Sequence, residues 1–298
     1  MSLLLSTAVG AASAAGGVLG LAWYASDQIN PIPRRVFKDD YTFTPWELGV
    51  PFEEVELTTP DQLNLSAWWL PHPEAQSVVI GCHSHVGAKP DLLGIGTNLW
   101  RAGHHVLLFD FRGRGRSDPW PNTLASMEVS DLLTAVNYAS ERAPNATIGV
   151  IGFSMGAAVA ILAAAQEARI AAVVADSSFT SATDVITHKM RRVLPVATEP
   201  LMALTGVLVA HRHGYHLSRV RPIDMVAHLA PRPLFVIHST ADSTTPVEHA
   251  HQLYAAAGEP RYLWLHEGSE HCGAYFADRC VYVDRVSDFF DQYLKSIE

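Results

Sequence analysis

The most informative chemistry in the sequence is a serine placed between two glycines. The apolar run 147–152 leads directly into Gly152-Phe153-Ser154-Met155-Gly156, and small residues follow at once. This order predicts a buried strand, a tight turn and a helix, with Ser154 in a strained backbone conformation at the turn. Residues 152 and 156 crowd each other in such a turn, which favours glycine at both. We therefore predict that Ser154 is a nucleophile at a helix N-terminus, where developing negative charge is favoured.

Strand-like and helix-like segments alternate around this turn. Short, mostly apolar runs, typical of strands buried on both faces, cover 77–82, 106–109, 147–152, 172–175, 234–238 and 262–265. Helical patterns between them cover 92–101, 128–142, 155–167, 248–257 and 281–295. This alternation predicts a mostly parallel sheet with helices on both faces. Two earlier strands, 53–57 and 63–70, are predicted to form a hairpin.

From about residue 52 to residue 294 the sequence resembles the α/β-hydrolase superfamily. Besides the serine turn, residues 110–117 look like that family's Asp-x-Arg-Gly-x-Gly-x-Ser turn, to which we assign no catalytic role. The resemblance implies the α/β-hydrolase fold, with a mostly parallel central sheet, helices on both faces and a small helical cap. The sequence is most similar to bacterial membrane-anchored relatives of monoacylglycerol lipase and acyl-protein thioesterase.

The resemblance also implies a base on the loop after the last strand, because a serine hydroxyl needs a neighbouring base to become a nucleophile. The sequence holds 15 histidines, so abundance selects none of them. Gly268-Ser269-Glu270-His271 resembles the family's loop that ends in the catalytic histidine, and we predict His271 as the base. His266, which abuts the strand 262–265, is interpreted as a strand-end or surface histidine.

The acid is expected on the loop after the preceding strand. Residues 238–246 resemble the family's His-Gly-x-x-Asp-x-x-x-Pro loop, so Asp242 would orient the imidazole of His271 and stabilise its cation. The chain order Ser154, Asp242, His271 matches this fold. Asp176, at the end of strand 172–175, is the rival acid, because some family members carry the acid there. A strand-end hydrogen-bonding role suits Asp176 better.

An acyl-transfer site also needs two backbone N–H donors for the oxyanion. We expect one from Met155, directly after the nucleophile. We expect the other from His85, because His83-Ser84-His85-Val86-Gly87 stands in place of the family's His-Gly-x motif. Serine at 84 and again at 239 replaces the family's usual glycine.

The first thirty residues differ from the rest. The 24 residues from Leu3 to Ser26 carry no charge, and about 20 apolar residues suffice to cross a bilayer. Arg34, Arg35 and Lys38 follow, and basic residues beside a span favour the cytoplasmic side. We predict a single-pass membrane anchor in residues 1–30 and a cytoplasmic catalytic domain. The alternative is a cleaved signal and a secreted or periplasmic protein. A buried amphipathic helix fits poorly, since no polar face is visible.

The predicted organisation is an anchor in 1–30, a linker over 31–51 and a hydrolase domain over 52–298, with a cap inserted at about 180–230. Apolar residues of the cap would either line a site for an acyl chain or an aromatic group, or pack the cap against the core. These residues are Met190, Leu194, Leu201, Met202, Leu204, Val207 and Leu208.

Composition excludes some classes of function. The net charge is −9 without a basic cluster, which argues against nucleic-acid binding. Three cysteines at irregular spacing form neither a disulfide framework nor a zinc motif, although a Cys272–Cys280 bridge stays open. His211, His213 and His216 form too short a pattern to establish a metal site. We predict no metal and no organic cofactor.

Together these features predict a serine hydrolase of carboxylic esters that works through an acyl-enzyme on Ser154. The expected partner is a small-molecule ester with an apolar acyl or aromatic group. A thioesterase, an amidase or a peptidase with the same triad is the alternative enzyme. A binding scaffold without catalysis is a further alternative, which the altered loop at Ser84 keeps open.

Overall fold

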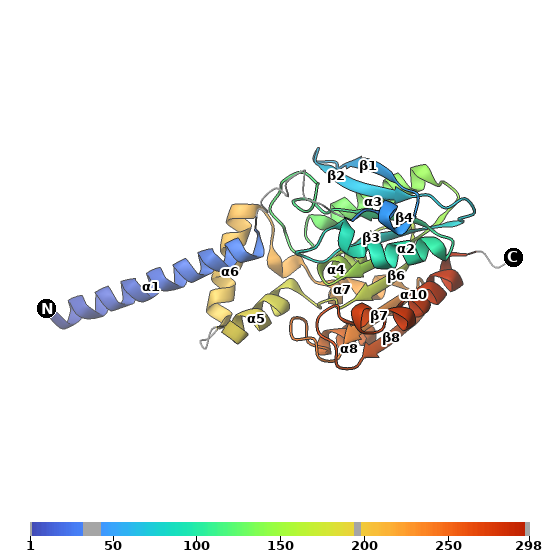
Figure 1. Cartoon of the computed structure of the whole chain (residues 1–298). Helices are drawn as coiled ribbons and strands as arrows, with labels where there is room; N and C mark the ends of the chain where they lie inside the picture. Colours follow the sequence, from blue (N-terminus) through green and yellow to red (C-terminus); the bar gives the residue numbers. More distant parts are fainter. Residues whose placement is uncertain (1, 32–42, 194–197, 296–298) are drawn as a thin grey trace.

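The computed structural model describes residues 2–31, 43–193 and 198–295, with side chains for 16–31, 43–192 and 198–295. In these ranges eight strands form one sheet in the order β1-β2-β4-β3-β5-β6-β7-β8 (Figure 1). The strands are β1 Glu53–Thr58, β2 Asn64–Leu70, β3 Ser77–Cys82, β4 His105–Phe109, β5 Thr147–Phe153, β6 Ile170–Asp176, β7 Leu234–Ser239 and β8 Arg261–His266. The pairs β1–β2 and β2–β4 are antiparallel, and every other pair is parallel.

The central strands are buried on both faces because helices cover each face. Along β3, Val78 and Ile80 enter one hydrophobic cluster, and Val79 between them enters the other. The first cluster includes residues of α3 (Glu128–Arg142), α4 (Met155–Ala164) and α8 (Glu248–Ala256). The second includes residues of α2 (Leu93–Arg101) and α10 (Arg279–Leu294). The period-two alternation of a strand thus supplies both cores.

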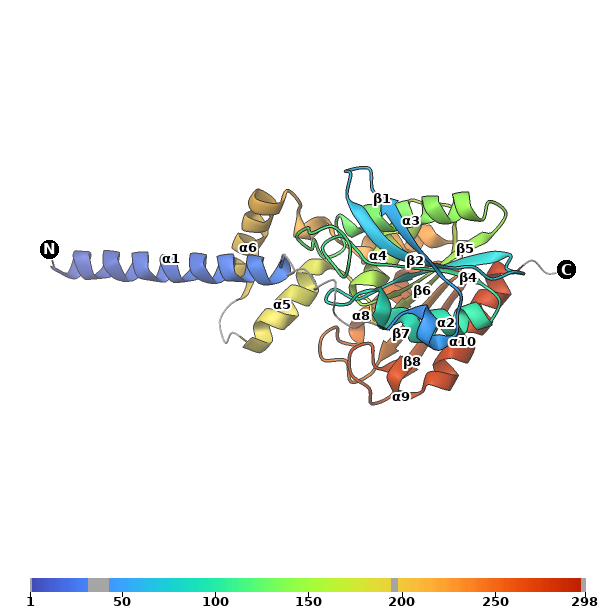
Figure 2. The same cartoon turned by 45° about the horizontal axis from the view of Figure 1, so that its top comes forward.

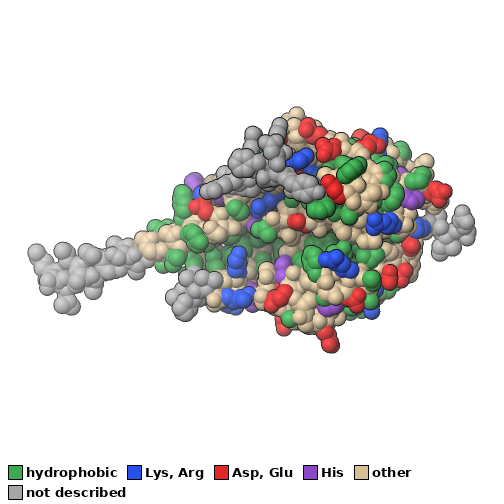
Figure 3. Space-filling model, in the orientation of Figure 1, with side chains coloured by type: hydrophobic (Ala, Val, Ile, Leu, Met, Phe, Trp, Pro, Cys, Tyr) green, Lys and Arg blue, Asp and Glu red, His purple; other side chains and the backbone are tan. Residues whose placement is uncertain are grey.

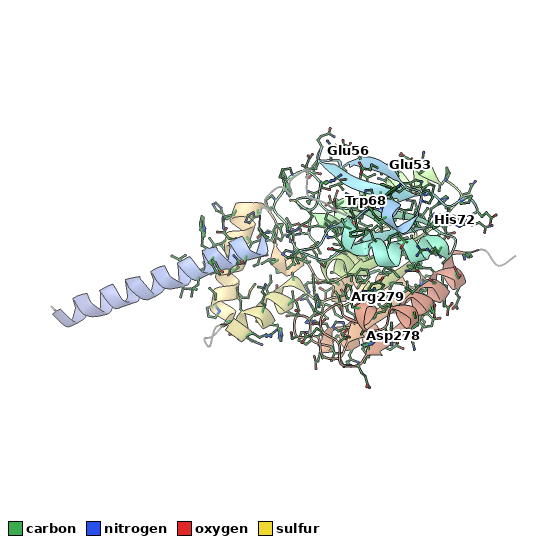
Figure 4. All side chains as sticks on the ribbon, viewed as in Figure 1. Glu53, Glu56, Trp68, His72, Asp278 and Arg279 are labelled. Carbon is green, nitrogen blue, oxygen red and sulfur yellow. The ribbon has the colours of Figure 1, made fainter. Side chains whose placement is uncertain are left out.

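The edge strand β1 is protected by charge. Glu53 and Glu56 are exposed on it, and Figure 4 shows both at the rim of the sheet, beside the buried Trp68 of β2. Charged side chains on an edge oppose pairing with another chain. At the opposite side of the molecule Asp278 begins α10, where its carboxylate accepts a hydrogen bond from the Val281 N–H at 3.2 Å.

The predicted fold class is confirmed. Strand 77–82 and helix 128–142 have the bounds expected from the sequence, and the predicted hairpin is the antiparallel pair β1–β2. The helix after Ser154 ends at Ala164, three residues earlier than predicted. Short helices absent from the prediction are η1 (Pro45–Leu48), η2 (Lys89–Leu92) and α9 (Ala274–Ala277).

Among the described residues between β6 and β7, all regular secondary structure is helical. They are α5 (Ala182–Val193), α6 (Thr198–His213), η3 (Leu217–Arg219), α7 (Pro222–Met225) and η4 (Val226–Leu229). Figure 2 shows α6 running across the N-terminal helix, with α5 below that helix. The predicted cap occupies this interval, although Leu194 lies outside the described residues. The proposed domain boundaries stay predictions.

The N-terminal segment is a helix, α1 (Ser2–Ile29), which extends away from the body and packs its C-terminal end against α6 (Figure 1). In the part of the chain that the structure describes, no helix combines the length and the apolarity needed to cross a membrane. The predicted single-pass anchor is therefore not supported. Residues 32–42 of the predicted linker, with Arg34, Arg35 and Lys38, lie outside the described residues.

Candidate active site

Ser154 occupies a strained turn between β5 and α4. Its φ of 54° and ψ of −115° are unusual for a residue with a side chain. The turn is fixed by its Ser154 N–H, which donates to the Asp176 carbonyl at 2.8 Å. A Cβ on Gly152 would come within 2.2 Å of the Gly156 carbonyl oxygen. Only glycine fits at 152, and the hydroxyl is lifted to the end of the sheet.

The structure brings the three predicted triad residues into one hydrogen-bonded chain. His271 Nε2 lies 2.8 Å from Ser154 Oγ, and its Nδ1 lies 2.7 Å from Asp242 Oδ2. The three side chains come from loops that follow β5, β7 and β8. These strands are parallel neighbours of β6 or of each other, so their carboxyl ends reach the same edge of the sheet. This geometry lets an imidazole take the hydroxyl proton of Ser154.

Asp242 is held as a carboxylate by its own loop. Its Oδ1 accepts hydrogen bonds from the N–H groups of Thr244 and Thr245, both at 2.8 Å, and its Oδ2 accepts one from the Thr245 hydroxyl at 2.8 Å. Burial raises the pKa of Asp242, but hydrogen bonds from His238 and His271 outweigh it and hold that pKa well below its ordinary value. A permanent negative charge therefore faces the Nδ1 of His271.

A second histidine supports the same carboxylate. The buried His238 lies four residues before Asp242, and its Nε2 is 2.6 Å from the Thr245 carbonyl and 3.4 Å from Asp242 Oδ2. Burial lowers the pKa of His238, but the hydrogen bonds to Asp242 and to Thr245 prevail and raise it. In the sequence, the only signal for His238 and Thr245 is their position within the loop that carries Asp242.

Side chains also join the loop of the acid to the loop of the base. Ser269 Oγ donates to Ser239 Oγ at 2.8 Å, and the same Ser269 oxygen lies 2.8 Å from His266 Nδ1. The Gly268 N–H donates to Thr240 Oγ1 at 3.1 Å. His266 thus lies in a bridge between the loops and does not reach Ser154. Serine in place of glycine at 239 supplies one of these bonds.

Asp176 lies near the triad without joining it. Its carboxylate is fully buried and accepts hydrogen bonds from the Ser177 hydroxyl and the Tyr282 hydroxyl, each at 2.8 Å. Burial raises the pKa of Asp176. Its hydrogen bonds are those of a strand-end structural group.

The expected oxyanion donors lie beside Ser154. Met155 is the first residue of α4, and the first N–H groups of a helix have no partner within it. His85 lines the same cavity as Ser154 and Met155, while a Cβ on Gly156 would come within 2.3 Å of the Cys82 carbonyl oxygen. This close approach brings the loop after β3 against the serine turn. The donor roles of Met155 and His85 stay predictions.

The loop after β3 is held by one tautomer of His83. The Phe111 N–H donates to His83 Nε2 at 3.0 Å, so that nitrogen is an acceptor. The other ring nitrogen, Nδ1, therefore carries the hydrogen and donates to the Ser84 carbonyl at 2.7 Å. Burial lowers the pKa of His83, and burial with the nearby Arg114 lowers the pKa of His85 to about 4. Both rings are neutral at pH 7.

A cavity of about 400 Å³ opens above Ser154, a size within the range of ~300–1,000 Å³ typical of small-molecule sites. The cap contributes apolar side chains to it, among them Ile186, Met190 and Leu201. The helix α1 contributes Leu21 and Ile29, which belong to the predicted anchor segment 1–30. In Figure 3 hydrophobic side chains gather in the hollow where α1 meets the body.

Other chemistry considered from the sequence is not assembled here. In the described part of the chain no group of three His, Cys, Asp or Glu side chains could hold a metal ion. Cys82, Cys272 and Cys280, all of which the structure describes, are free thiols, so Cys272 and Cys280 are not bridged.

Comparison with known proteins supports the same class. Residues 77–196 match the family model described as the alpha/beta hydrolase fold. With the sheet order, this match shows that the chain has the α/β-hydrolase fold. The predicted resemblance to monoacylglycerol lipases and acyl-protein thioesterases stays a prediction.

Individual proteins are similar to this chain over most of its length. The solved structure of the Pyrococcus furiosus esterase Pf2001 superposes with a TM-score of 0.74 at 25% identity, covering 88% of this chain and 98% of that one. The uncharacterized protein YqkD of Bacillus subtilis is 26% identical over 231 residues, which are 76% of this chain and 75% of YqkD. The uncharacterized protein Rv2307c of Mycobacterium tuberculosis is 28% identical over 243 residues, 80% of this chain and 79% of Rv2307c.

Proposed function

We propose that the protein hydrolyses carboxylic esters through an acyl-enzyme on Ser154. The observation that carries the proposal is the hydrogen-bonded chain from Ser154 through His271 to the Asp242 carboxylate. A strained serine that lines a largely apolar cavity suits an ester with an apolar acyl group. The similarity to an esterase of known structure supports the choice of bond.

In the first half-reaction, His271 Nε2 accepts the proton of Ser154 Oγ while that oxygen attacks the ester carbonyl carbon. The carbonyl oxygen becomes an oxyanion, which the N–H groups of Met155 and His85 would stabilise. The intermediate collapses, the carbon–oxygen bond to the alcohol breaks, and His271 gives its proton to the departing alkoxide. Asp242 stabilises the imidazolium in the interval.

In the second half-reaction, water replaces the alcohol. His271 takes a proton from the water as its oxygen attacks the acyl carbon. The new intermediate collapses, Ser154 Oγ leaves and recovers the proton from His271, and the carboxylic acid departs. The triad returns to its starting state, so each turnover consumes one ester and one water.

A fluorophosphonate probe tests the nucleophile. The probe forms a covalent bond with an activated serine, so wild type is expected to be labelled at Ser154, as read by peptide mass spectrometry. The Ser154→Ala variant should lose the label and about 10⁴-fold or more of the ester kcat/KM. Equal labelling of both chains would reject Ser154.

The bond cleaved is tested with matched substrates. Wild type is assayed on p-nitrophenyl esters, on anilides and on thioesters of the same acyl groups. We expect the esters to be cleaved with the highest kcat/KM. A higher kcat/KM on the thioester or on the anilide would replace the proposed esterase by a thioesterase or an amidase with the same triad.

A further inference from the structure

One face of α1 belongs to the active-site cavity. Leu21, Tyr24, Ala25 and Gln28 line the same cavity as Ser154. Their spacing of three and four residues places them on a single side of the helix. A segment more than a hundred residues before the nucleophile therefore forms one wall of its pocket.

A neighbouring face of α1 is packed into the body. Ala22 and Ser26 are fully buried, and Asn30, just after the helix, is 3% exposed. Asn30 Nδ2 donates to the Tyr215 hydroxyl at 2.7 Å and also to the Asn122 carbonyl. Asn122 in turn contacts Met155 Sδ at 3.5 Å. The end of α1 is thus linked through one residue to the residue after the nucleophile.

The outer side of α1 is held by Arg212 of α6. Its guanidinium forms an ion pair with Asp27 at 2.7 Å and donates to Ser26 Oγ at 3.2 Å. It also stacks over the ring of Trp23, 4.0 Å from the ring centroid. Contacts on two sides of α1 fix the position of its cavity-lining face. A surface that discriminates between substrates must be fixed in this way.

Polarity changes across the cavity. Near Ser154 it is lined by His85, Thr244 and Thr245, whereas the helical side is mostly apolar. Leu21 and Tyr24 line the cavity and are still 42% and 63% exposed. The cavity therefore opens to solvent along α1 and is not closed at its far end. Such an open apolar trough suits a chain longer than the cavity itself.

We propose that the cavity-lining face of α1 between Leu21 and Ile29 is the acyl-binding wall of the site and that the substrates are esters of extended aliphatic acyl chains. The inference rests on the proposed ester hydrolysis. An aliphatic chain that starts at the carbonyl above Ser154 runs past Ala25 and leaves along Leu21. Each methylene that the trough covers strengthens transition-state binding by up to about fourfold. Short or compact acyl groups do not reach this wall.

Blocking the trough tests the inference in the full-length chain. Ala25→Trp places a large ring in it, whereas Leu19→Trp adds the same ring at an exposed position of α1 that does not line the cavity. For Ala25→Trp we expect kcat/KM on p-nitrophenyl decanoate to fall about tenfold or more and kcat/KM on the acetate to change less than about twofold. Leu19→Trp should change neither.

A second variant removes the wall without filling the trough. In Leu21→Ala/Tyr24→Ala the ratio of decanoate to acetate kcat/KM should fall about fivefold, because apolar contact with the chain is lost. Circular dichroism and fluorophosphonate labelling confirm that each variant is folded with an active serine. If the ratio is unchanged in both Ala25→Trp and this double variant, the proposed acyl wall is wrong, while the proposed ester hydrolysis still stands. If wild type neither cleaves any ester nor takes up the probe, the proposed function fails and this inference fails with it.

Discussion

The two halves of the candidate active site are built in different ways. Ser154, Asp242 and His271 stand on loops at the ends of β5, β7 and β8, and backbone groups within three residues of Asp242 hold its carboxylate. The opposite wall comes from α1, α5 and α6, and α1 is joined to α6 by contacts between residues far apart in the chain. Local loop patterns therefore mark the first half in the sequence, whereas contacts between distant residues assemble the second half. Substitutions in the first half should change the rate, and those in the second should change which substrate is accepted.

The largest difference in kcat is expected between variants of the two carboxylates, Asp242 and Asp176. Asp242→Asn removes the acceptor that fixes the His271 tautomer, so kcat should fall about 10³–10⁴-fold. Asp176→Asn keeps the side-chain shape at a carboxylate that bonds Tyr282 and not His271, so kcat of the folded protein should fall less than about tenfold. Initial rates on one ester compare the two variants. The reverse ranking would make Asp176 the acid.

An intermediate effect is expected where α1 is attached to α6. Arg212→Ala removes the stack on Trp23 and the ion pair with Asp27, worth roughly 1 kcal/mol together at these partly exposed positions. The ratio of decanoate to acetate kcat/KM should fall about threefold while fluorophosphonate labelling stays at the wild-type rate. Arg212→Lys keeps the charge but loses the planar stack, and should give a smaller fall.

Limited proteolysis provides an independent readout of that attachment. Cleavage within α1 should be fastest in Arg212→Ala, slower in Arg212→Lys and slowest in wild type. Equal cleavage and equal substrate ratios in the three chains would show that Arg212 does not hold the wall.

The smallest expected effect concerns stability and pH. The pKa of His238 in the folded protein lies above its ordinary value, so its stabilising contribution is complete at low pH and is lost as the pH rises through the folded-state pKa. Between about pH 5.5 and about pH 9 wild type should therefore lose more unfolding free energy than His238→Gln does. Urea unfolding at both pH values measures this difference.

Comparing wild type with the variant isolates His238. The buried rings of His83 and His85 have lowered pKa values and act with the opposite sign, but they are present in both chains and cancel. Parallel pH profiles for wild type and His238→Gln would show that His238 stays neutral in the folded protein.

Much of the fold was predictable because its signals are local. Strands buried on both faces are continuous apolar runs, and the glycines at 152 and 156 mark a turn whose geometry excludes a Cβ. The loop patterns around Asp242 and His271 placed two further residues on the correct strand ends. Predicting these three positions required no knowledge of contacts between distant residues, only the order of strands in a familiar fold.

The second half of the site was not predictable in the same way. Residues 21–29 of α1 present one face to the cavity and another to the body. Exposed positions of the helix are apolar as well, among them Val18, Leu19 and Trp23, so the sequence shows no polar face and looks like a membrane span. The partner of this segment is Arg212, 185 residues after Asp27, and nothing in the local sequence indicates that pairing. The role of His238 was hidden for a different reason, since only the folded loop directs its ring at Asp242.

The apolar wall supplied by residues 21–29 has a practical consequence for anyone who shortens the chain. Removing the first thirty residues would leave the nucleophile, the base and the acid in place but would take away one side of the trough, together with the link from Asn30 to Asn122. If the proposed acyl wall is correct, assays on such a shortened chain will show a preference for small acyl groups that the truncation itself creates. Substrate profiles are therefore best measured on a chain that keeps residues 1–30.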